Sequence, residues 1–521
     1  MRPGVTSLLA GLLLAALAPL ATAGADQHAT AERTHGQATV PARSGVWYEI
    51  FVRAWYDTDG DGTGDLNGVT ARLDYLKSLG VDGIWLMPIN PSPSYHGYDV
   101  TDYRAINPRY GTLADFRRLL DAAHRRGIRV IMDLVVNHTS DQHPWFLAAR
   151  DPNDPHHAWY SWAGPGTDLH ATSATGGPAW HALGRQHYLG VFTGEMPDLD
   201  FDTPAVRAAV TDIGRYWLAQ GVDGFRLDAA RHVYVDFPQQ ADDPRVLERN
   251  LAWWSAFHHA MADVRPDVYV VGEVTRDDPS QLAPWFGPLD AVFDFPLAAQ
   301  LVKSARSERN DGLSALLGRI GAAIPPGRDA PFLSNHDQER VMSQLGGDAR
   351  HMRTAAAMLL TLPGRPFLYY GEELGMRGRK PDPDLREPMR WYRDPHGSGE
   401  SRWKRFTAGD GPDVTVEAEQ ADPHSLLAWY RTLIGWRRQL AVLRDGALHL
   451  PAIPNPGLAS WELSDAGADV LVVHNLSRKP QTLELAGPLT RFSRLRLASE
   501  AGAHIAAGRL HLPAYASVVL E

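Results

Sequence analysis

Eight short apolar segments rich in strand-forming residues recur along the chain, and this series constrains the fold more than any other feature. Helical signals separate most of them; one helix is expected from Thr112, where Thr112 and Asp115 form a capping box, to a stop at Gly127. Strands that alternate with helices indicate parallel βαβ units, and eight strands close a (β/α)8 TIM barrel. The expected strands are Val46–Val52, Gly83–Ile89, Arg129–Val136, Gly224–Leu227, Val268–Val271, Ala291–Phe295, Pro331–Leu333 and Pro366–Tyr370.

Seven of these strands are followed by polar side chains. Barrel enzymes build their sites at the C-terminal ends of the strands, so we expect these side chains to meet at one rim. Helix caps and solvated loops would explain one or two of them, but not easily all seven. The residues are Asn90, Asn137, His138, Asp228, Glu273, Asp294, Asn335, His336, Asp337 and Glu372.

Both ends of the chain and one internal segment depart from the barrel pattern. The N-terminus has Arg2, an apolar run from Leu8 to Leu20 and then small residues, which is typical of an export signal and too short for a membrane anchor. We therefore expect a secreted protein, extracellular or periplasmic. The expected division is an export signal at 1–23, a disordered leader at 24–44, the barrel at 45–138 and 201–445, an inserted domain at 139–200 after the third strand, and a C-terminal antiparallel β-domain at 446–521.

The composition excludes several classes of binding partner and several kinds of covalent link. The formal net charge is -10 and no run of Lys or Arg suits a phosphate backbone, so nucleic acid is not an expected partner. The chain has no cysteine, which excludes disulfides and a lipoprotein anchor. No segment after the export signal is apolar enough to cross a membrane. We expect a monomer that binds neither nucleic acid nor membrane.

Three carboxylates follow apolar strands, namely Asp228, Glu273 and Asp337. An acid at the end of a buried strand is costly unless it is paired or functional. Arg226 lies two residues before Asp228, so both side chains point to the same side of the strand. A cation there would keep Asp228 ionised, as a nucleophile requires, although a buried structural ion pair is the alternative. Cleavage of a glycosidic bond with retention needs two carboxyl groups about 5 Å apart. The spacing alone does not identify a sugar as substrate.

Five motifs occur in a fixed order along the chain. They are Asp133–His138, Met196–Asp200, Gly224–Asp228, Gly272–Val274 and Asn335–Asp337. Four lie at the ends of the third, fourth, fifth and seventh strands, and Met196–Asp200 lies near the end of the insertion. Together they resemble the signature regions of the α-amylase family, glycoside hydrolase family 13. One such motif is weak, but five in order are specific, and the resemblance extends from Gly45 into the C-terminal β-domain.

The resemblance implies a role for each matching residue. Asp228 would be the nucleophile, Glu273 the acid and base, and Asp337 would bind sugar hydroxyls and favour the oxocarbenium-like transition state. The residues implied to hold the sugar or tune the acids are Tyr98, which would stack under the sugar, His138, Arg226 and His336. We expect the apolar strand and nearby negative charges to raise the pKa of Glu273, and Arg226 to lower that of Asp228.

A loop after the first strand is expected to bind Ca²⁺. It places Asp57, Asp59, Asp61 and Asp65 at positions 1, 3, 5 and 9, as in an EF-hand, but has Gly68 in place of the final glutamate. The alternative is a flexible acidic turn. The resemblance adds Thr63 as a carbonyl ligand, because several family members have a similar loop. It also implies a second calcium site that would use Asn137, Asp198 and the carbonyl of His232.

Within the family, the fifth motif and Ala229–His232 resemble the group intermediate between α-amylases and oligosaccharide-acting members. Export favours a polymeric substrate, hence an α-amylase acting on starch and other α-glucans. By contrast, Asp99 and Arg386 are similar to residues that close the pocket of exo-acting α-glucosidases, which would favour short maltooligosaccharides. Non-catalytic relatives, such as partners of membrane transporters, lose catalytic carboxylates and carry a membrane helix, and a starch-binding module would not need all these groups.

Overall fold

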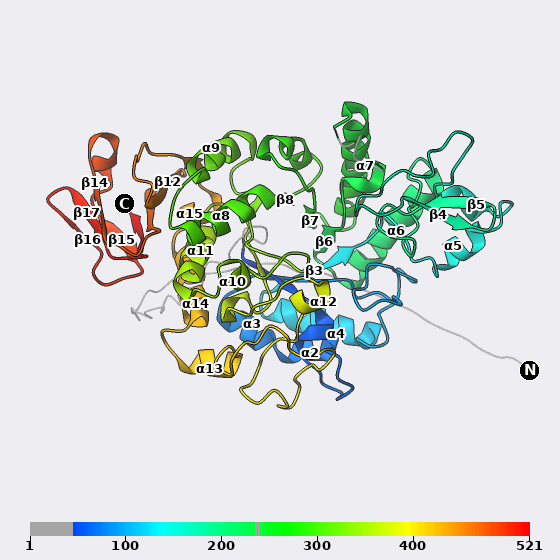
Figure 1. Ribbon diagram of the computed structural model, residues 1–521, viewed down its shortest axis with the longest axis horizontal. Coiled ribbons are helices and arrows are strands. Elements are labelled where there is room, and N and C mark those ends of the chain that lie inside the picture. The colour runs from blue at the N-terminus through cyan, green and yellow to red at the C-terminus, as the bar shows by residue number, and fades with distance from the viewer. Residues whose placement is uncertain (1–44, 235–236, 238–239, 241) are drawn as a thin grey trace, which may run out of the picture. The chain divides into compact units, whose positions relative to one another are not determined.

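The computed structural model describes residues 45–234, 237, 240 and 242–521, and the predicted export signal and leader lie outside this range. Its described residues contain eight parallel strands in the order β10-β1-β2-β3-β6-β7-β8-β9. Of these, β3, β6, β7 and β8 are labelled in Figure 1. Two backbone hydrogen bonds, from Arg365 to Asp329 at 2.7 Å and from Phe367 to Pro331 at 2.9 Å, join the two ends into a barrel. The predicted fold class is therefore confirmed. The bounds are β1 Trp47–Ile50, β2 Gly83–Leu86, β3 Arg129–Leu134, β6 Gly224–Leu227, β7 Tyr269–Gly272, β8 Ala291–Phe293, β9 Asp329–Ala330 and β10 Phe367–Tyr369.

The seventh strand is the one whose predicted position is wrong. We expected Pro331–Leu333, whereas β9 covers Asp329–Ala330. Pro331 has no N–H and cannot donate to a neighbouring strand, so the strand ends where that proline begins. Apolar residues after it belong to the loop that leads to the active site.

Helices surround the barrel, and local sequence explains where they begin. Thr112 and Asp115 form the predicted capping box of α4. Proline at the first turn begins α6, which ends at Gly221 with a φ of 106°, a left-handed conformation that glycine adopts without strain. The longer helices are α4 Leu113–Arg125, α6 Pro204–Gln220, α7 Pro244–Ala262, α8 Phe295–Ser307, α9 Leu313–Ala323, α11 Ala349–Thr361 and α14 Leu426–Gln439. The shorter ones are α1 Val52–Trp55, α2 Leu66–Ala71, α3 Leu73–Leu79, α5 Pro144–Ala149, α10 Val341–Gln344, α12 Asp382–Leu385, α13 Val416–Ala421 and α15 Val442–Asp445.

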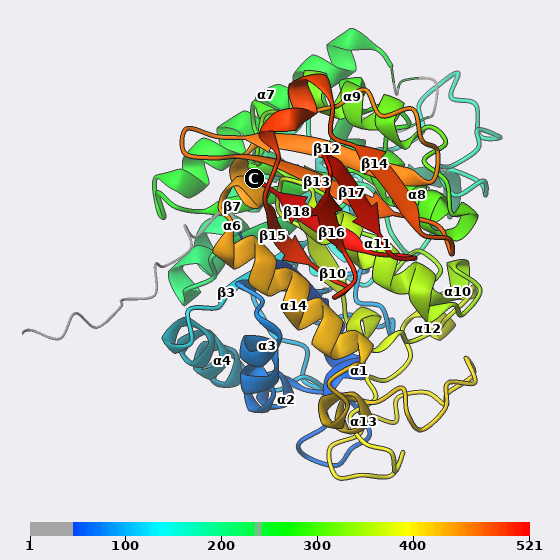
Figure 2. The ribbon, with the colours of Figure 1, turned by 90° about the vertical axis from the view of Figure 1, so that its left-hand side faces the viewer.

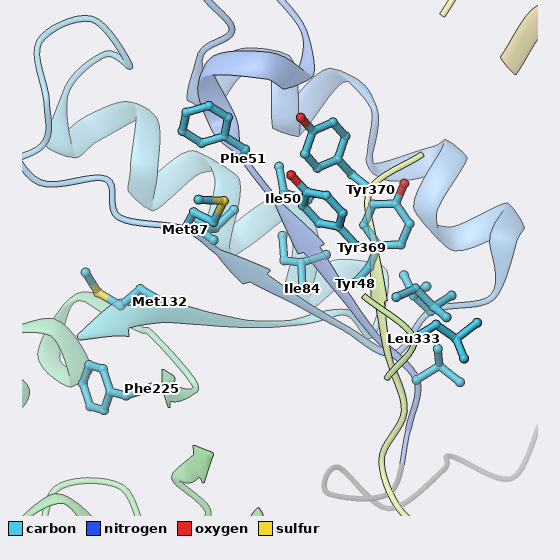
Figure 3. Close-up of a cluster of buried hydrophobic side chains, with 14 of the residues drawn as sticks. Tyr48, Ile50, Phe51, Ile84, Met87, Met132, Phe225, Leu333, Tyr369 and Tyr370 are labelled. Atoms are coloured by element: carbon cyan, nitrogen blue, oxygen red, sulfur yellow. The ribbon is translucent and has the colours of Figure 1, made fainter. Parts of the chain in front are cut away.

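Alternate residues of each strand face opposite sides of the barrel wall. Tyr48, Ile84 and Phe225 belong to the apolar layer between strands and helices (Figure 3). The other set, such as Trp47 and Trp85, fills the barrel interior. Side chains two residues apart point to the same side of a strand. In four strands the residue that follows an interior residue on this side is polar. The pairs, each an interior residue and the one two positions later, are Trp47 and Glu49, Ile131 and Asp133, Arg226 and Asp228, and Val271 and Glu273.

The predicted insertion, 139–200, lies between β3 and α6. It contains α5 and an antiparallel pair, β4 Trp180–Leu183 and β5 Gln186–Leu189. An isolated bridge between His138 and Asp198 ties its last part back to the end of β3. The insertion therefore returns to the rim where the predicted site residues lie.

The C-terminal region forms antiparallel sheets, drawn in orange and red in Figure 2. In the described chain one sheet has the order β11-β12-β13-β18-β15 and another β14-β17-β16. Against the barrel, His474 contacts the hydroxyl of Thr361 at 3.1 Å and Trp461 donates to the carbonyl of Thr361 at 3.2 Å. The bounds are β11 Ala447–His449, β12 Leu458–Ser464, β13 Asp469–Asn475, β14 Gln481–Glu484, β15 Leu495–Ala498, β16 His504–Ala506, β17 Arg509–Leu512 and β18 Ser517–Leu520.

Glu308, directly after α8, forms a second junction with the C-terminal sheets. Its carboxylate accepts hydrogen bonds from Arg478 at 2.9 Å and from the hydroxyl of Tyr515 at 2.8 Å, and lies 3.3 Å from the ring of His351. These contacts, that of Arg478 foremost, lower the pKa of Glu308 to about 2. Among the described residues, no helix has both the length and the apolar character needed to span a membrane.

Candidate active site

A pocket of about 410 Å³ opens where the barrel strands end and the insertion returns. All three predicted catalytic acids line it, together with groups from the insertion and from the segment around α12. The structure therefore brings the three acids together, as the strand-end pattern predicts. The lining residues that matter below are Tyr95, His96, Tyr98, His138, Asp228, His232, Glu273, Lys380, Asp382, Asp337 and Arg386.

Arg226 lies beneath this pocket and holds three carboxylates. Its Nη1 is 2.6 Å from Asp228 and 2.8 Å from Asp133, and its Nη2 is 2.7 Å from Glu273. Asp133 is the cross-strand neighbour of Arg226 in the β3–β6 pairing. The indole of Trp85, 4.9 Å from the guanidinium carbon, covers one face of the arginine. One fully buried cation thus fixes Asp228 and Glu273 close to each other.

The contacts of Arg226 leave one oxygen of each acid available to a substrate. Asp228 uses Oδ1 for Arg226. Glu273 uses Oε2 both for Arg226 and for the backbone N–H of Ala229, at 3.1 Å. Asp228 Oδ2 and Glu273 Oε1 therefore remain available on the side of the pocket.

Asp337 is held by cations on two sides. Arg386 donates to its Oδ1 at 2.8 Å, and the Nε2 of His336 lies 3.2 Å from its Oδ2. The ring of Tyr98 stacks on His336 at 5.6 Å, and its hydroxyl is 2.6 Å from Nε2. Although desolvation in the pocket opposes charge, His336 and Arg386 lower the pKa of Asp337 well below its ordinary value. This carboxylate is therefore ionised at neutral pH.

Burial raises the pKa of Asp228 and that of Glu273, while Arg226 opposes the rise in both. The predicted rise for Glu273 is present, and the charges of Asp228 and Asp337 add to it. Burial raises the pKa of Asp228 overall, because it outweighs the arginine, although Arg226 does lower this pKa as predicted. Arg226 contacts both acids and therefore does not by itself make their pKa values differ. Asp337 raises the pKa of both acids, and Asp228 raises that of Glu273 further.

The remaining predicted sugar-binding residues divide into two groups. His138 lines the pocket, where its Nε2 contacts the carbonyl of Tyr98 at 3.1 Å, and burial lowers its pKa to about 4, so the ring is neutral. Asp99 does not occur among the described residues that line the pocket. It is buried within the loop after β2, where the hydroxyls of Ser92 and Ser94 donate to it, and it lies 4.0 Å from the ring of His96, which lines the pocket. The structure does not place it beside Arg386 at the wall of the pocket.

Three of the polar strand-end residues have structural contacts instead. Asn90 donates to the carbonyls of Tyr103 and Ala105. Asp294 caps α8 by accepting from the N–H of Leu297 at 2.9 Å. Glu372 accepts from a buried tyrosine hydroxyl at 2.8 Å. The expectation that all seven strand ends meet at one rim is therefore wrong for these three, because helix starts and loops behind the rim also need polar groups.

The predicted calcium loop brings three of its acids together. Oxygens of Asp57, Asp59 and Asp61 lie within 4.8 Å of one another. Thr63 is buried beside them, and its N–H donates to Asp61 at 2.6 Å. Asp65 instead caps α2 by accepting from the N–H of Gly68 at 2.7 Å. Hard oxygen donors at this spacing fit Ca²⁺.

Two of the three residues predicted for the second calcium site, Asn137 and Asp198, contact each other. The amide of Asn137 donates to Asp198 at 2.6 Å, and the other oxygen of Asp198 accepts from the N–H of Val191 at 2.5 Å. His232 lies at the pocket, with its ring 5.5 Å from that of Phe192. A Ca²⁺ site needs oxygen atoms that point at the ion. Here the NH₂ group of Asn137 points at the Asp198 carboxylate, so this arrangement fits a cation less well.

Sequence reasoning missed several residues of the site. Glu49 sits inside a strand that was interpreted as apolar, and only the interior-facing alternation would have found it. Asp133 is the first residue of one of the five motifs but was given no role. Lys380 and Asp382 line the pocket from the segment before Arg386, which carries no recognised motif.

Comparisons with known proteins agree with this geometry. Residues 49–446 match the family described as alpha amylase, catalytic domain, and residues 458–519 match the alpha-amylase SusG C-terminal domain. Alpha-amylase 3 of Dictyoglomus thermophilum is 38% identical over 455 residues, which cover 86% of this chain and 88% of that protein. A trehalose synthase/amylase of Mycolicibacterium smegmatis is 34% identical over 540 residues, covering 89% of each. The crystal structure of an alpha-amylase from H. orenii matches with a TM-score of 0.84 and 42% identity, covering 92% of this chain and 99% of that chain.

Proposed function

Because the chain belongs to the α-amylase family of glycoside hydrolases, we propose that it is a secreted α-amylase that cleaves α-1,4-glucosidic bonds of starch and maltooligosaccharides with retention. The observation that carries this proposal is the contact of Arg226 with both Asp228 and Glu273. Retention needs a nucleophile and an acid/base close together, and one guanidinium holds the two here.

In the first step, Asp228 Oδ2 attacks the anomeric carbon and the glycosidic C–O bond breaks. Glu273 transfers its proton to the leaving oxygen, so the released chain carries a hydroxyl and the enzyme holds a glucosyl ester. Burial and the neighbouring carboxylates, which raise the pKa of Glu273, keep that proton available.

In the second step, Glu273, now a carboxylate, removes a proton from water, which attacks the same carbon. The ester bond to Asp228 breaks and the acid is regenerated. Asp337, held by His336 and Arg386, is placed to bind sugar hydroxyls, and its lowered pKa keeps it an acceptor throughout the cycle.

The surroundings of the pocket support internal cleavage of long chains. Tyr95 lines both the catalytic pocket and a neighbouring hollow of about 470 Å³, and Lys380 lines both the pocket and another of about 330 Å³. We propose that these neighbouring hollows receive further sugars of a glucan chain. The burial of Asp99 also argues against a wall formed by Asp99 and Arg386.

A second candidate is an exo-acting hydrolase or transglucosidase on short maltooligosaccharides. The observation in its favour is the direct bond of Arg386 to Asp337 inside the pocket, together with the similarity to a trehalose synthase/amylase. An arginine there would bind the non-reducing sugar.

We also propose that Asp57, Asp59 and Asp61, with the carbonyl of Thr63, hold a Ca²⁺ ion. When bound, the ion would neutralise the charge of the acids and tie the loop after α1 together. Its position away from the catalytic pocket gives it a structural role.

A time course on soluble starch tests the proposed function. Iodine colour, reducing ends and free glucose are followed together, with calcium present. Colour that collapses while few reducing ends have appeared supports the α-amylase. Glucose that accumulates while the colour persists would favour the exo-acting candidate, and no product at all would contradict both.

A further inference from the structure

Glu49 lies inside the barrel next to a residue of the active site but contacts no substrate position. It is the third residue of β1 and is 2% exposed. Its Oε1 is 2.5 Å from Nδ1 of His336, a ring that is fully buried. Because Trp47 and Glu49 share the interior face, β1 itself directs the carboxylate at the imidazole.

Both nitrogens of His336 face oxygen atoms. Nδ1 faces Glu49, and Nε2 faces Asp337 Oδ2 at 3.2 Å and the hydroxyl oxygen of Tyr98 at 2.6 Å. Tyr98 donates its single proton to Asp133 at 3.2 Å, so its oxygen is free to accept from the ring. Only an imidazole protonated on both nitrogens donates to carboxylates on both sides.

The other charged groups around the ring come from several elements. Arg386 donates to the backbone carbonyl of His336 at 3.0 Å. The guanidinium carbon of Arg226 lies 6.0 Å from the ring of Tyr98, which itself stacks on His336. Trp85 from β2 packs its edge on the imidazole at 5.6 Å. Burial alone favours the neutral ring, but Asp337 and Glu49 raise the pKa of His336 to about 10.

We propose that Glu49 is a positioning residue of the hydrolysis: it keeps His336 as an imidazolium, and thereby keeps Asp337 ionised and oriented toward the sugar. The inference rests on the proposed function, because it assigns Asp337 to the glucan. Without the charge of Glu49, the ring has one carboxylate neighbour fewer, and its proton is lost at a lower pH. A neutral ring with its proton on Nδ1 would turn a lone pair toward Asp337.

The test measures kcat/KM against pH, with a substrate whose cleavage does not depend on the proton of Glu273. With α-maltosyl fluoride the leaving fluoride needs no protonation, so the alkaline limb of kcat/KM no longer reports the general acid. In wild type we expect kcat/KM to stay flat up to about pH 9. In Glu49→Gln, loss of an adjacent opposite charge lowers the pKa of His336 by about 1–3 units. A fall to a pKa of about 8 gives an about tenfold loss of kcat/KM at pH 9, with activity at pH 6 within about threefold of wild type.

Two variants control for damage to the fold. Glu373→Gln makes the same change in another buried glutamate, which accepts from Tyr48, the neighbour of Glu49 in β1, at 2.7 Å; its alkaline limb should not move. Glu49→Asp keeps the charge and should keep the limb near its wild-type position, even where packing lowers activity at every pH.

The inference is overturned if the alkaline limb of kcat/KM in Glu49→Gln stays where it is in wild type. An equal loss of kcat/KM at pH 6 and at pH 9 also overturns it. So does a shift of the same size in Glu373→Gln or in Glu49→Asp. If the wild-type enzyme cleaves neither the fluoride nor starch, the proposed function fails, and that outcome is distinct from cleavage with an unmoved limb.

Discussion

Replacement of Glu308 by Gln should weaken the attachment of the C-terminal sheets to the barrel in a pH-dependent way. The carboxylate joins Arg478 and Tyr515 of the C-terminal region to the end of α8. These contacts lower its pKa from an ordinary 4.5 to about 2. Because the pKa is lower in the folded protein than in the unfolded chain, the contribution is fully present above about pH 5 and is lost as the pH falls toward 2.

The size of the effect follows from that shift. A change of about 2.5 units corresponds to about 3.4 kcal/mol at about 1.36 kcal/mol per unit. Arg478 is 70% exposed, so solvent screening reduces this figure, and we expect a loss of about 1–2 kcal/mol at pH 7. An unfolding entropy of about 2.1 cal/mol/K per residue over about 480 residues converts this loss into about 1–2 °C in Tm.

Scanning calorimetry of wild type and Glu308→Gln from pH 7 to pH 3 measures the difference in Tm between the two proteins. It should fall to about three quarters of its pH 7 value at pH 4 and to about 40% at pH 3. Glu484→Gln, which changes an exposed glutamate of β14, serves as the matched control and should shift Tm by less. A Tm difference that stays constant across this range would refute the electrostatic reasoning and point to lost packing.

Three further outcomes are expected. Glu273→Gln should lower the rate of starch hydrolysis by about 10²–10⁴-fold or more with an unchanged Tm, since it removes the general acid; near wild-type release of reducing ends would contradict its role. Removal of Ca²⁺ with EDTA should lower the Tm of wild type, and the same treatment should have little effect on Asp59→Asn, whose loop has lost a ligand; equal shifts in both would count against the site. Burial lowers the pKa of His474 to about 3, so this ring disfavours the folded state progressively as the pH drops below about 6.5; in His474→Asn the fall of Tm between pH 7 and pH 5 should be shallower, and an unchanged slope would show that other groups cause it.

Periodicity predicted the strands well because each barrel strand is short, apolar and bounded by turns. It placed the strand at Gly224–Leu227 with its observed bounds and failed for the seventh, where Pro331 ends the hydrogen-bonded segment early. The motifs led to the three acids because each lies after a strand, Asp228 and Glu273 directly and Asp337 in the loop that follows β9. They did not lead to Glu49, which lies within β1 and was counted as part of a buried run, and they included Asp133 without giving it a role.

Contacts between distant segments were the part that sequence could not supply. The side of the loop to which Asp99 turns depends on Ser92 and Ser94, and the balance of pKa values at Asp228 depends on burial that only the assembled barrel creates. Arg226 was expected to act on one acid, whereas the pairing of β3, β6 and β7 gives it three.

The cross-strand pairing of Asp133 with Arg226 also bears on folding fidelity. If β3 slipped by one residue against β6, Asp133 would leave the interior and enter the apolar layer under the helices, and Met132 or Leu134 would face the guanidinium. Such a slip would bury an uncompensated carboxylate and leave Arg226 with fewer partners, a loss of several kcal/mol. The charges needed for catalysis therefore also penalise misregistered barrels, so that a chain with a correct active site is also one with correctly aligned strands.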